Sequence, residues 1–479
     1  MSRHLSNRDA WIKISGFVLL ISLFLLTSCE MMLVEGKRQY PAGSARLLLY
    51  MHSTSSNPPD VDFTISDITL ETVDGRTVHA ASGPIEVNAL TLAAGQILLK
   101  EAMVEPAAYR GIRIGLSKAS IKRAEGRASL AIEREIFIKE MISLGPRQSA
   151  VVSLAWDPDA SVEKGYRFAP AVAAEAQTPS SRSLLVFVSN SGSDYVSVID
   201  RSLERVIGAI TVDETPEGMA LNATQDLLYV VNSGARTISV IDTAQLSVIE
   251  TIPLMVGLKP TDAVFMPDSP TSIDGKLYII NRMSNDVTVV STSSKRVIKT
   301  VPVGTLPSAI AADTSRREVY VANERSNNLT VIRTSDDTVS SQIPVDKRPM
   351  GIILGKDKLY VLNEGSYNIS VVSPSLRRVT STIALTDPPA RGTRAFDGRL
   401  YIANATADSI TFISSLDVMT RTIKAGGGPI AMAGDEKRNR LYVANYSDGT
   451  VSLVEPIGEK MITKLYVGKN PYSIVLSDR

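Results

Sequence analysis

The sequence predicts an all-β protein in which a signal peptide and a β-sandwich domain precede a seven-bladed β-propeller. Three observations carry this prediction. An apolar strand that ends in asparagine recurs seven times between residues 184 and 479. Short strands of alternating apolar and polar residues fill residues 43–170. A basic segment followed by an apolar one opens the chain, which is typical of a signal peptide.

The bulk composition excludes several kinds of chemistry. The chain has 479 residues, which is too long for one ordinary core, so we expect two or three domains. It contains a single cysteine, so no disulfide can form within the chain. The net charge of +1 gives no reason to expect a nucleic acid or a strongly acidic partner.

The segment that precedes Cys29 has the features of a targeting sequence. Arg3, Arg8 and Lys13 form a positive region, and Ile14 to Leu26 forms an apolar stretch. That stretch is short for a membrane span and suitable for a signal peptide.

Residues 26–29 read Leu-Thr-Ser-Cys, which resembles the lipobox of bacterial lipoproteins. The resemblance implies a lipoprotein signal peptide over 1–28 and a lipidated tether over 29–42. Cys29 would then carry diacylglycerol and an N-linked acyl chain such as palmitate, and several acyl chains make anchoring stable. Glu30 in place of aspartate favours the outer membrane, at its periplasmic or surface face, over the inner membrane. The alternative is an ordinary signal peptide followed by an incidental cysteine.

Residues 43–170 are predicted to form the sandwich. A hairpin is indicated at Thr72 to Thr77, which contains Asp-Gly. The other expected strands include 45–51, 61–65, 90–99, 112–116 and 151–156.

The stretch from Leu90 through Gly95 to Ala108-Tyr109 and Ile112-Arg113-Ile114 resembles a domain of unknown function found in many bacterial lipoproteins. Ala108 stands where that family has glycine. The resemblance implies a β-sandwich with no known catalysis, and we interpret Tyr109 as a packed strand residue and Arg113 as a surface residue. Residues 171–183 are rich in alanine, proline and serine and are predicted to form the interdomain linker.

The seven repeats occupy residues 184–479. Their terminal asparagines recur at a nearly constant spacing, and the one longer interval, between Asn232 and Asn281, contains an insertion. A second and a third strand follow each asparagine. A proline then opens a short strand of small or aliphatic residues, such as Ser308 to Ala312. The seven asparagines are Asn190, Asn232, Asn281, Asn323, Asn363, Asn404 and Asn445.

Four short strands in each repeat describe one propeller blade. The first repeat lacks its own proline strand, whereas the sequence ends with one at Pro471. We therefore expect the last strand to complete the first blade and close the ring. The pattern resembles the YVTN-type (YncE-like) propeller repeats of bacterial and archaeal surface and periplasmic proteins, and this resemblance implies a fold more than a function.

Within the propeller there is no histidine, cysteine or tryptophan. Histidine-ligated copper, haem and most zinc sites therefore lack ligands there, and we expect no metal and no cofactor. A calcium site of oxygen ligands is an alternative, from loop aspartates that belong to different blades: Asp194, Asp286, Asp408 and Asp448. We interpret the seven asparagines as structural, because an asparagine at a strand end hydrogen-bonds neighbouring backbone and turns.

Departures from the repeat are better candidates for a binding site. Arg394 stands where other blades have leucine or alanine, so it needs a carboxylate such as Asp387 or Asp397, or an anionic ligand. The candidate ligand- or partner-binding mouth comprises Arg391, Arg394, Lys259, Lys347, Arg348, Lys469, Tyr472 and Glu217.

These observations favour a non-catalytic binding or scaffolding lipoprotein of the cell envelope, with a protein, glycan or small ligand at the propeller face. The first alternative is a lactonase-like hydrolase that uses an oxygen-ligated metal. Nucleic-acid binding is the third reading, and the neutral charge and absent tryptophans weigh against it.

Overall fold

The computed structural model describes residues 43–175, 184–395 and 397–478. The predicted signal peptide, Cys29 and the tether over 29–42 lie outside the described residues, as does 176–183 of the predicted linker. In the part of the chain that is described, no helix has the length and apolarity that crossing a membrane requires.

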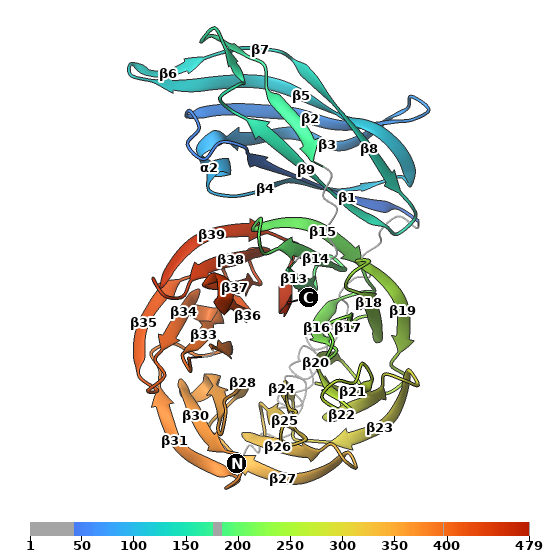
Figure 1. Ribbon diagram of the computed structural model, residues 1–479, viewed down its shortest axis with the longest axis vertical. Coiled ribbons are helices and arrows are strands. Elements are labelled where there is room, and N and C mark those ends of the chain that lie inside the picture. The colour runs from blue at the N-terminus through green and yellow to red at the C-terminus, as the bar shows by residue number, and fades with distance from the viewer. Residues whose placement is uncertain (1–42, 176–183, 396, 479) are drawn as a thin grey trace, which may run out of the picture. The chain divides into compact units, whose positions relative to one another are not determined.

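Residues 45–175 form the predicted sandwich of two main sheets (Figure 1). The first sheet has the order β12(Ala171–Glu175), β9(Ser149–Asp157), β1(Ala45–Ser53) and β4(Ile97–Val104). The second has the order β3(Thr77–Asn88), β2(Val61–Thr72), β5(Ala107–Arg123) and β6(Gly126–Ser129), and β8(Glu135–Leu144) pairs with β5. A small third sheet joins β10(Val162–Glu163), β11(Arg167–Phe168) and β7(Ala131–Ile132).

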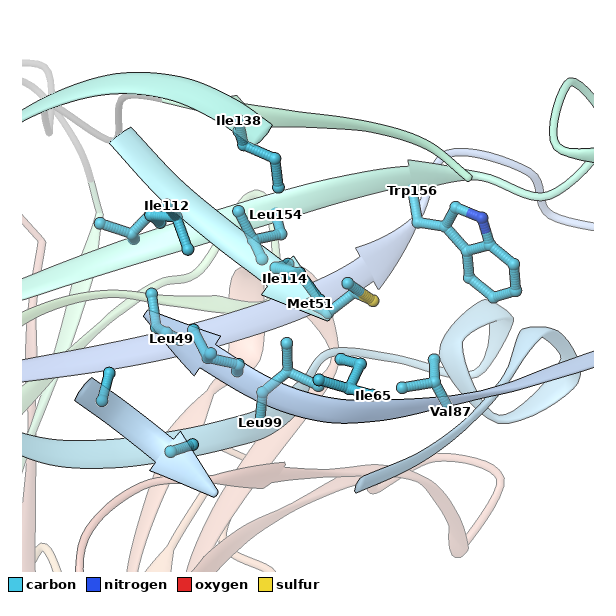
Figure 2. Packing of buried hydrophobic residues seen from close by; sticks show 14 of the residues in the cluster. Leu49, Met51, Ile65, Val87, Leu99, Ile112, Ile114, Ile138, Leu154 and Trp156 are labelled. Atoms are coloured by element: carbon cyan, nitrogen blue, oxygen red, sulfur yellow. The ribbon is translucent and has the colours of Figure 1, made fainter. Parts of the chain in front are cut away.

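Alternating residues of the two main sheets meet in one hydrophobic core (Figure 2). The aromatic rings of Phe63, Trp156 and Phe168 pack against one another within it. The ring centroids of Phe63 and Trp156 are 4.8 Å apart, and their ring planes make an angle of 76°. Trp156 is fully buried, and its Nε1 donates to Ser161 Oγ at 2.9 Å, so its polar edge is satisfied. Tyr109 also points into this core, whereas Arg113 pairs with surface carboxylates.

Two predicted boundaries in this domain were wrong. The expected strand over 90–99 begins as a short helix, α2(Ala89–Ala93), because Asn88 Oδ1 accepts from the Thr91 amide at 3.0 Å and caps it. Residues 171–175, which we assigned to the linker, pair with β9 as strand β12. Their side chains alternate between exposed and half-buried, which suits the edge of a sheet.

Residues 185–477 form seven four-stranded antiparallel sheets around one axis, which confirms the predicted propeller (Figure 1). We number the blades by their outer three strands. Blades one to three, from the innermost strand outward, are β40(Pro471–Ser477), β13(Leu185–Asn190), β14(Tyr195–Asp200), β15(Arg205–Thr211); β16(Pro216–Leu221), β17(Leu227–Asn232), β18(Thr237–Asp242), β19(Ser247–Pro253); and β20(Pro260–Pro267), β21(Gly275–Asn281), β22(Asp286–Ser291), β23(Arg296–Pro302).

The remaining blades follow the same order. Blades four to seven are β24(Pro307–Asp313), β25(Glu318–Asn323), β26(Asn328–Arg333), β27(Thr338–Pro344); β28(Pro349–Leu354), β29(Leu359–Asn363), β30(Asn368–Ser373), β31(Arg378–Ala384); β32(Arg391–Arg394), β33(Leu400–Asn404), β34(Ser409–Ile413), β35(Met419–Lys424); and β36(Pro429–Asp435), β37(Arg440–Asn445), β38(Thr450–Glu455), β39(Lys460–Tyr466). Three short 3-10 helices, Glu364–Ser366, Ala405–Ala407 and Glu436–Arg438, lie in turns.

The seven asparagines are all fully buried and repeat one set of contacts. In each blade, the asparagine Nδ2 donates to the hydroxyl of a serine or threonine seven residues later on the next strand. In blade one, for example, Asn190 Nδ2 lies 2.9 Å from Ser197 Oγ, and in blade four Asn323 Nδ2 lies 2.9 Å from Thr330 Oγ1. The repeated serine or threonine in the second strand is therefore the partner of the asparagine.

The residue four positions after each asparagine has a left-handed backbone and turns the chain into the next strand. Where it is Asp or Asn, its side chain also reaches the next blade. Asp194 Oδ1 accepts from the Thr215 amide at 2.9 Å, and Asp408 Oδ1 accepts from the Gly428 amide at 2.8 Å. Two of the aspartates that we considered as calcium ligands thus connect neighbouring blades.

The sandwich and the propeller belong to one compact unit, Ala45–Arg479. Tyr50 on β1 is buried in the same apolar cluster as Val186 of the first blade. On the outermost strand of that blade, the Val206 amide donates to Gln96 Oε1 at 2.9 Å, and Thr211 Oγ1 lies 2.6 Å from Ser149 Oγ.

The ring closes as predicted, because β40 pairs with β13 along its whole length. A buried arginine strengthens this closure. Arg201 lies in the turn of blade one, and its Nε and Nη2 both lie 2.7 Å from Asp435 Oδ2 at the end of β36. Its Nη1 donates to the Ser477 carbonyl at 2.9 Å and to the Asp478 carboxylate. One side chain thus joins the first blade, the last blade and the closing strand.

We expect Arg201→Met to destabilise the protein strongly. The Asp435 carboxylate is 1% exposed, and loss of the Arg201 guanidinium would leave its buried charge with only the Arg438 guanidinium, 3.9 Å away, as a counterion. Breaking such a pair costs about 3–5 kcal/mol. Urea unfolding followed by circular dichroism measures the change in the free energy of unfolding.

The matched control is Arg333→Met, which removes a surface pair with Asp336 and should change stability little. The double variant Arg201→Met, Asp435→Asn should recover part of the loss. Equal stability of Arg201→Met and the wild type would contradict the role given to this pair.

Candidate binding site at the proline end of the propeller

The innermost strands bring one set of side chains together at one end of the propeller. Each of these strands follows or begins with a proline at the same end, and we call this the proline end. Each innermost strand contacts the next around the axis, and β40 contacts both β36 and β16. Residues that lie two positions after the prolines therefore face each other across the axis.

An ion pair crosses the axis at this position. Arg391, two positions after Pro389 in blade six, places Nη1 3.2 Å from Asp262 Oδ2 in blade three. Its Nη2 donates to the Ser308 carbonyl in blade four at 2.9 Å. Burial raises the pKa of Asp262, and the Arg391 charge only partly opposes this effect. The Arg391 guanidinium of blade six therefore contacts blades three and four, neither of which is adjacent to blade six.

Three further side chains share this electrostatic environment. Lys259 Nζ lies 3.1 Å from Glu217 Oε1. Burial raises the pKa of the Tyr472 hydroxyl, and the Glu217 carboxylate raises it further. The Tyr472 hydroxyl thus stays protonated and can donate a hydrogen bond at neutral pH. We call Glu217, Lys259, Asp262, Arg391 and Tyr472 the axial cluster.

A chain of ion pairs continues outward from the axial cluster. Arg282 pairs with Glu324, which also lies 3.4 Å from Arg348 Nε. Arg348 Nη2 in turn lies 2.9 Å from Glu364 Oε2. This chain crosses the loops of blades three to five at the proline end.

The predicted mouth residues thus fall into three groups. Glu217, Lys259, Arg391 and Tyr472 meet in the axial cluster, and Arg348 belongs to the outer chain. Lys347 and Lys469 are exposed on proline-end loops. Arg394 lies at the other end of β32, in a separate cavity, because the four residues of this strand span the height of the blade.

Four charged residues of this end were not predicted from the sequence: Asp262, Arg282, Glu324 and Glu364. A signal for Asp262 exists in the repeat alignment. The position two residues after the proline holds Gly, Asp, Ala, Gly, Arg, Ala and Ser in blades two to seven and one. Two charged residues of opposite sign at one repeat position of a closed ring indicate that they can pair across the axis.

An apolar surface borders these charges. Met255, Val256, Leu258 and Met283 are exposed by 82%, 40%, 52% and 59%, and we call them the apolar fringe. They lie on two adjacent loops, since the Met283 amide donates to the Leu258 carbonyl at 3.0 Å. Leu258 directly precedes Lys259 of the axial cluster.

Among the described residues, no group of three or more His, Cys, Asp or Glu side chains is arranged to hold a metal ion. The other two aspartates considered for calcium also serve turns. Asp286 Oδ1 accepts from Asn281 Nδ2 at 2.6 Å, and Asp448 Oδ2 accepts from the Gly427 amide at 2.6 Å.

Comparison with known families identifies one match over part of the propeller. The family described as "Lactonase, 7-bladed beta-propeller" matches residues 177–342. No curated protein matches the chain.

Solved structures resemble this chain at low sequence identity. A functionally unknown protein from Desulfotomaculum acetoxidans is 12% identical, covers 61% of this chain and 98% of its own, and has a TM-score of 0.54. Kuenenia stuttgartiensis hydrazine synthase is 19% identical over 54% of this chain and 88% of its own, with a TM-score of 0.46. Virginiamycin B lyase from Staphylococcus aureus is 15% identical over 55% of this chain and 91% of its own, with a TM-score of 0.47.

The axial ion pair gives a prediction about pH. The pKa of Asp262 is higher in the folded than in the unfolded chain. At a pH between these two pKa values the folded chain binds a proton that the unfolded chain has lost. The free energy of unfolding therefore falls as the pH rises through this interval. In Arg391→Met the folded pKa rises further, because the opposing charge is lost. We expect this variant to lose about 1–3 kcal/mol near neutral pH and to recover as the pH falls.

Urea unfolding at several pH values between about 4 and 8 measures this effect. The double variant Asp262→Asn, Arg391→Met removes the titrating group and should lose the added pH dependence. A single variant whose stability varies with pH as in the wild type would refute the coupling between the two residues.

Proposed function

We propose that this protein is an envelope-anchored lipoprotein that binds a protein partner through the proline end of its propeller and catalyses no reaction on it. The apolar fringe beside the axial cluster is the observation that carries the proposal. Exposed apolar patches bordered by charged residues are typical of protein interaction sites. Two of the four residues are methionines, whose flexible side chains adapt to a partner's surface.

The charges beside the fringe would add specificity. Lys259 is 39% exposed and its partner Glu217 is 7% exposed, so the lysine is the group that a partner can reach. Lys347 and Lys469 extend the positive charge around the same end of the propeller. A partner with an apolar centre and an acidic border would match this surface.

Anchoring rests on the predicted lipidation of Cys29. A lipid anchor would hold the protein at the envelope, which we expect to be the outer membrane. The sandwich would then lie between the anchor and the propeller in the chain, as a spacer. A bound partner would be concentrated at the membrane surface without a membrane span of its own.

Site-specific photo-crosslinking in cells tests the binding surface. A photoreactive residue at Leu258 or Met283 of the full chain should give one discrete protein adduct. The matched control is Leu416, which is 83% exposed in a turn of blade six, away from the proline end. The adduct should be lost in Met255→Glu, Met283→Glu and kept in Leu416→Glu.

The contrary results are equally clear. The same adducts from Leu416 and Leu258 would show non-specific contact. If neither Leu258 nor Met283 gives an adduct in a correctly located protein, the proposal of a protein partner is contradicted. A glycan or a small molecule would then be the ligand of this surface.

The lactonase family match favours a second candidate, hydrolysis of a lactone at the axial cluster. Glu217 and Asp262 are the carboxylates that could act there. Purified protein would be assayed with aliphatic γ- and δ-lactones, with and without added divalent metal ions. Our proposal expects no rate above buffer. A rate that disappears in both Glu217→Gln and Asp262→Asn would instead establish the hydrolase.

A further inference from the structure

A second departure from the repeat lies at the end of the propeller opposite the prolines. Five positions after the proline, the other blades carry Leu221, Phe265, Ala312, Leu354, Gly434 and Leu476, whereas blade six carries Arg394. Arg394 and Gly434 are neighbours in the ring, because β32 contacts β36. A Cβ atom at Gly434 would meet no atom within 4 Å, so space is open where a side chain is usual.

These two departures border a cavity of about 210 Å³, which we call the Arg394 pocket. It also includes Thr393 and Tyr401 of blade six and Ile457 of blade seven. The pocket has a suitable size for a small metabolite.

The charges in the pocket leave Arg394 as the group available to a ligand. Arg399 Nε lies 2.7 Å from Asp397 Oδ2, and Arg440 Nε lies 2.6 Å from Glu204 Oε1. The Arg394 guanidinium is half-buried and makes no hydrogen bond or ion pair with the side chains that the structure describes. Its charge contributes only weakly to the lowered pKa of Asp397, whose close partner is Arg399.

A half-buried guanidinium without a counterion is unfavourable, and a carboxylate matches its fork of donors with two parallel hydrogen bonds. The remaining lining narrows the choice of ligand. Three arginines against Asp397 and Glu436 give the lining a net charge of +1, which suits a ligand with a single negative charge. Burial raises the pKa of Tyr401 to about 12, so its hydroxyl stays protonated beside Thr393. Ile457 adds an apolar wall.

We infer that the Arg394 pocket binds a small organic monocarboxylate, with Arg394 holding the carboxylate group. This site is separate from the proline end and does not depend on the partner proposed there. A hydroxyl on the ligand would match the polar side of the pocket, so a short 2-hydroxy acid is a suitable probe. With few atoms in contact, the expected dissociation constant is in the millimolar range.

Saturation-transfer NMR on the full-length protein with lactate tests the inference, and lactamide serves as the uncharged analogue. We expect a saturable signal with lactate and at least a tenfold weaker one with lactamide. Arg394→Met should abolish the lactate signal. The matched control Arg421→Met removes an exposed arginine of the same blade, and this variant should keep the lactate signal.

Gly434→Leu provides an independent test by filling the cavity. Leucine occupies the equivalent position in three other blades, so the variant should fold, and thermal unfolding checks this. It should lose lactate binding with Arg394 still present. Binding retained in Arg394→Met, equal binding of lactamide, or no binding to the wild-type protein would each overturn the inference.

Discussion

Closure of the ring is the constraint on which the rest of the propeller depends. No blade has a core of its own, because each apolar cluster combines side chains of two neighbouring blades. Tyr229 and Val231 of blade two, for example, pack with Phe265 and Leu277 of blade three. An open ring would expose one such half-core at each end. The pairing of β40 with β13, held by the buried Arg201, is what prevents this.

Both candidate sites arise where a repeat position loses its usual residue. Two positions after the proline, Asp262 and Arg391 replace small residues and meet across the axis. Five positions after it, Arg394 and Gly434 replace aliphatic residues in adjacent blades and border a cavity. The seven asparagines show the opposite behaviour, since they repeat without exception and connect neighbouring strands and loops of the propeller. In this fold, therefore, departures from the repeat are more informative about function than the repeat itself.

Much of the fold could be predicted from sequence because the determining contacts are local. Each asparagine and its serine or threonine partner seven residues later lie within one blade. The proline strand that closes the ring follows the same repeat pattern. The ion pair between Asp262 and Arg391 could not be predicted in the same way, because 129 residues separate the two partners. The capped helix α2 was missed for another reason. Its Leu-Thr-Leu stretch alternates between apolar and polar residues, as a strand does. The signal for a helix is the side chain of Asn88, which caps the helix N-terminus.

The order in which the ring is assembled has a consequence for biosynthesis. The chain leaves the ribosome with its N-terminus first, but the innermost strand of blade one, β40, follows the strands of all the other blades in the sequence. Six blades can form progressively, while the first blade waits with one unpaired edge until Pro471–Ser477 has emerged. The ring can thus close only after Pro471–Ser477 has been synthesised. Premature termination within the final repeat would therefore disable the first blade as well as the last.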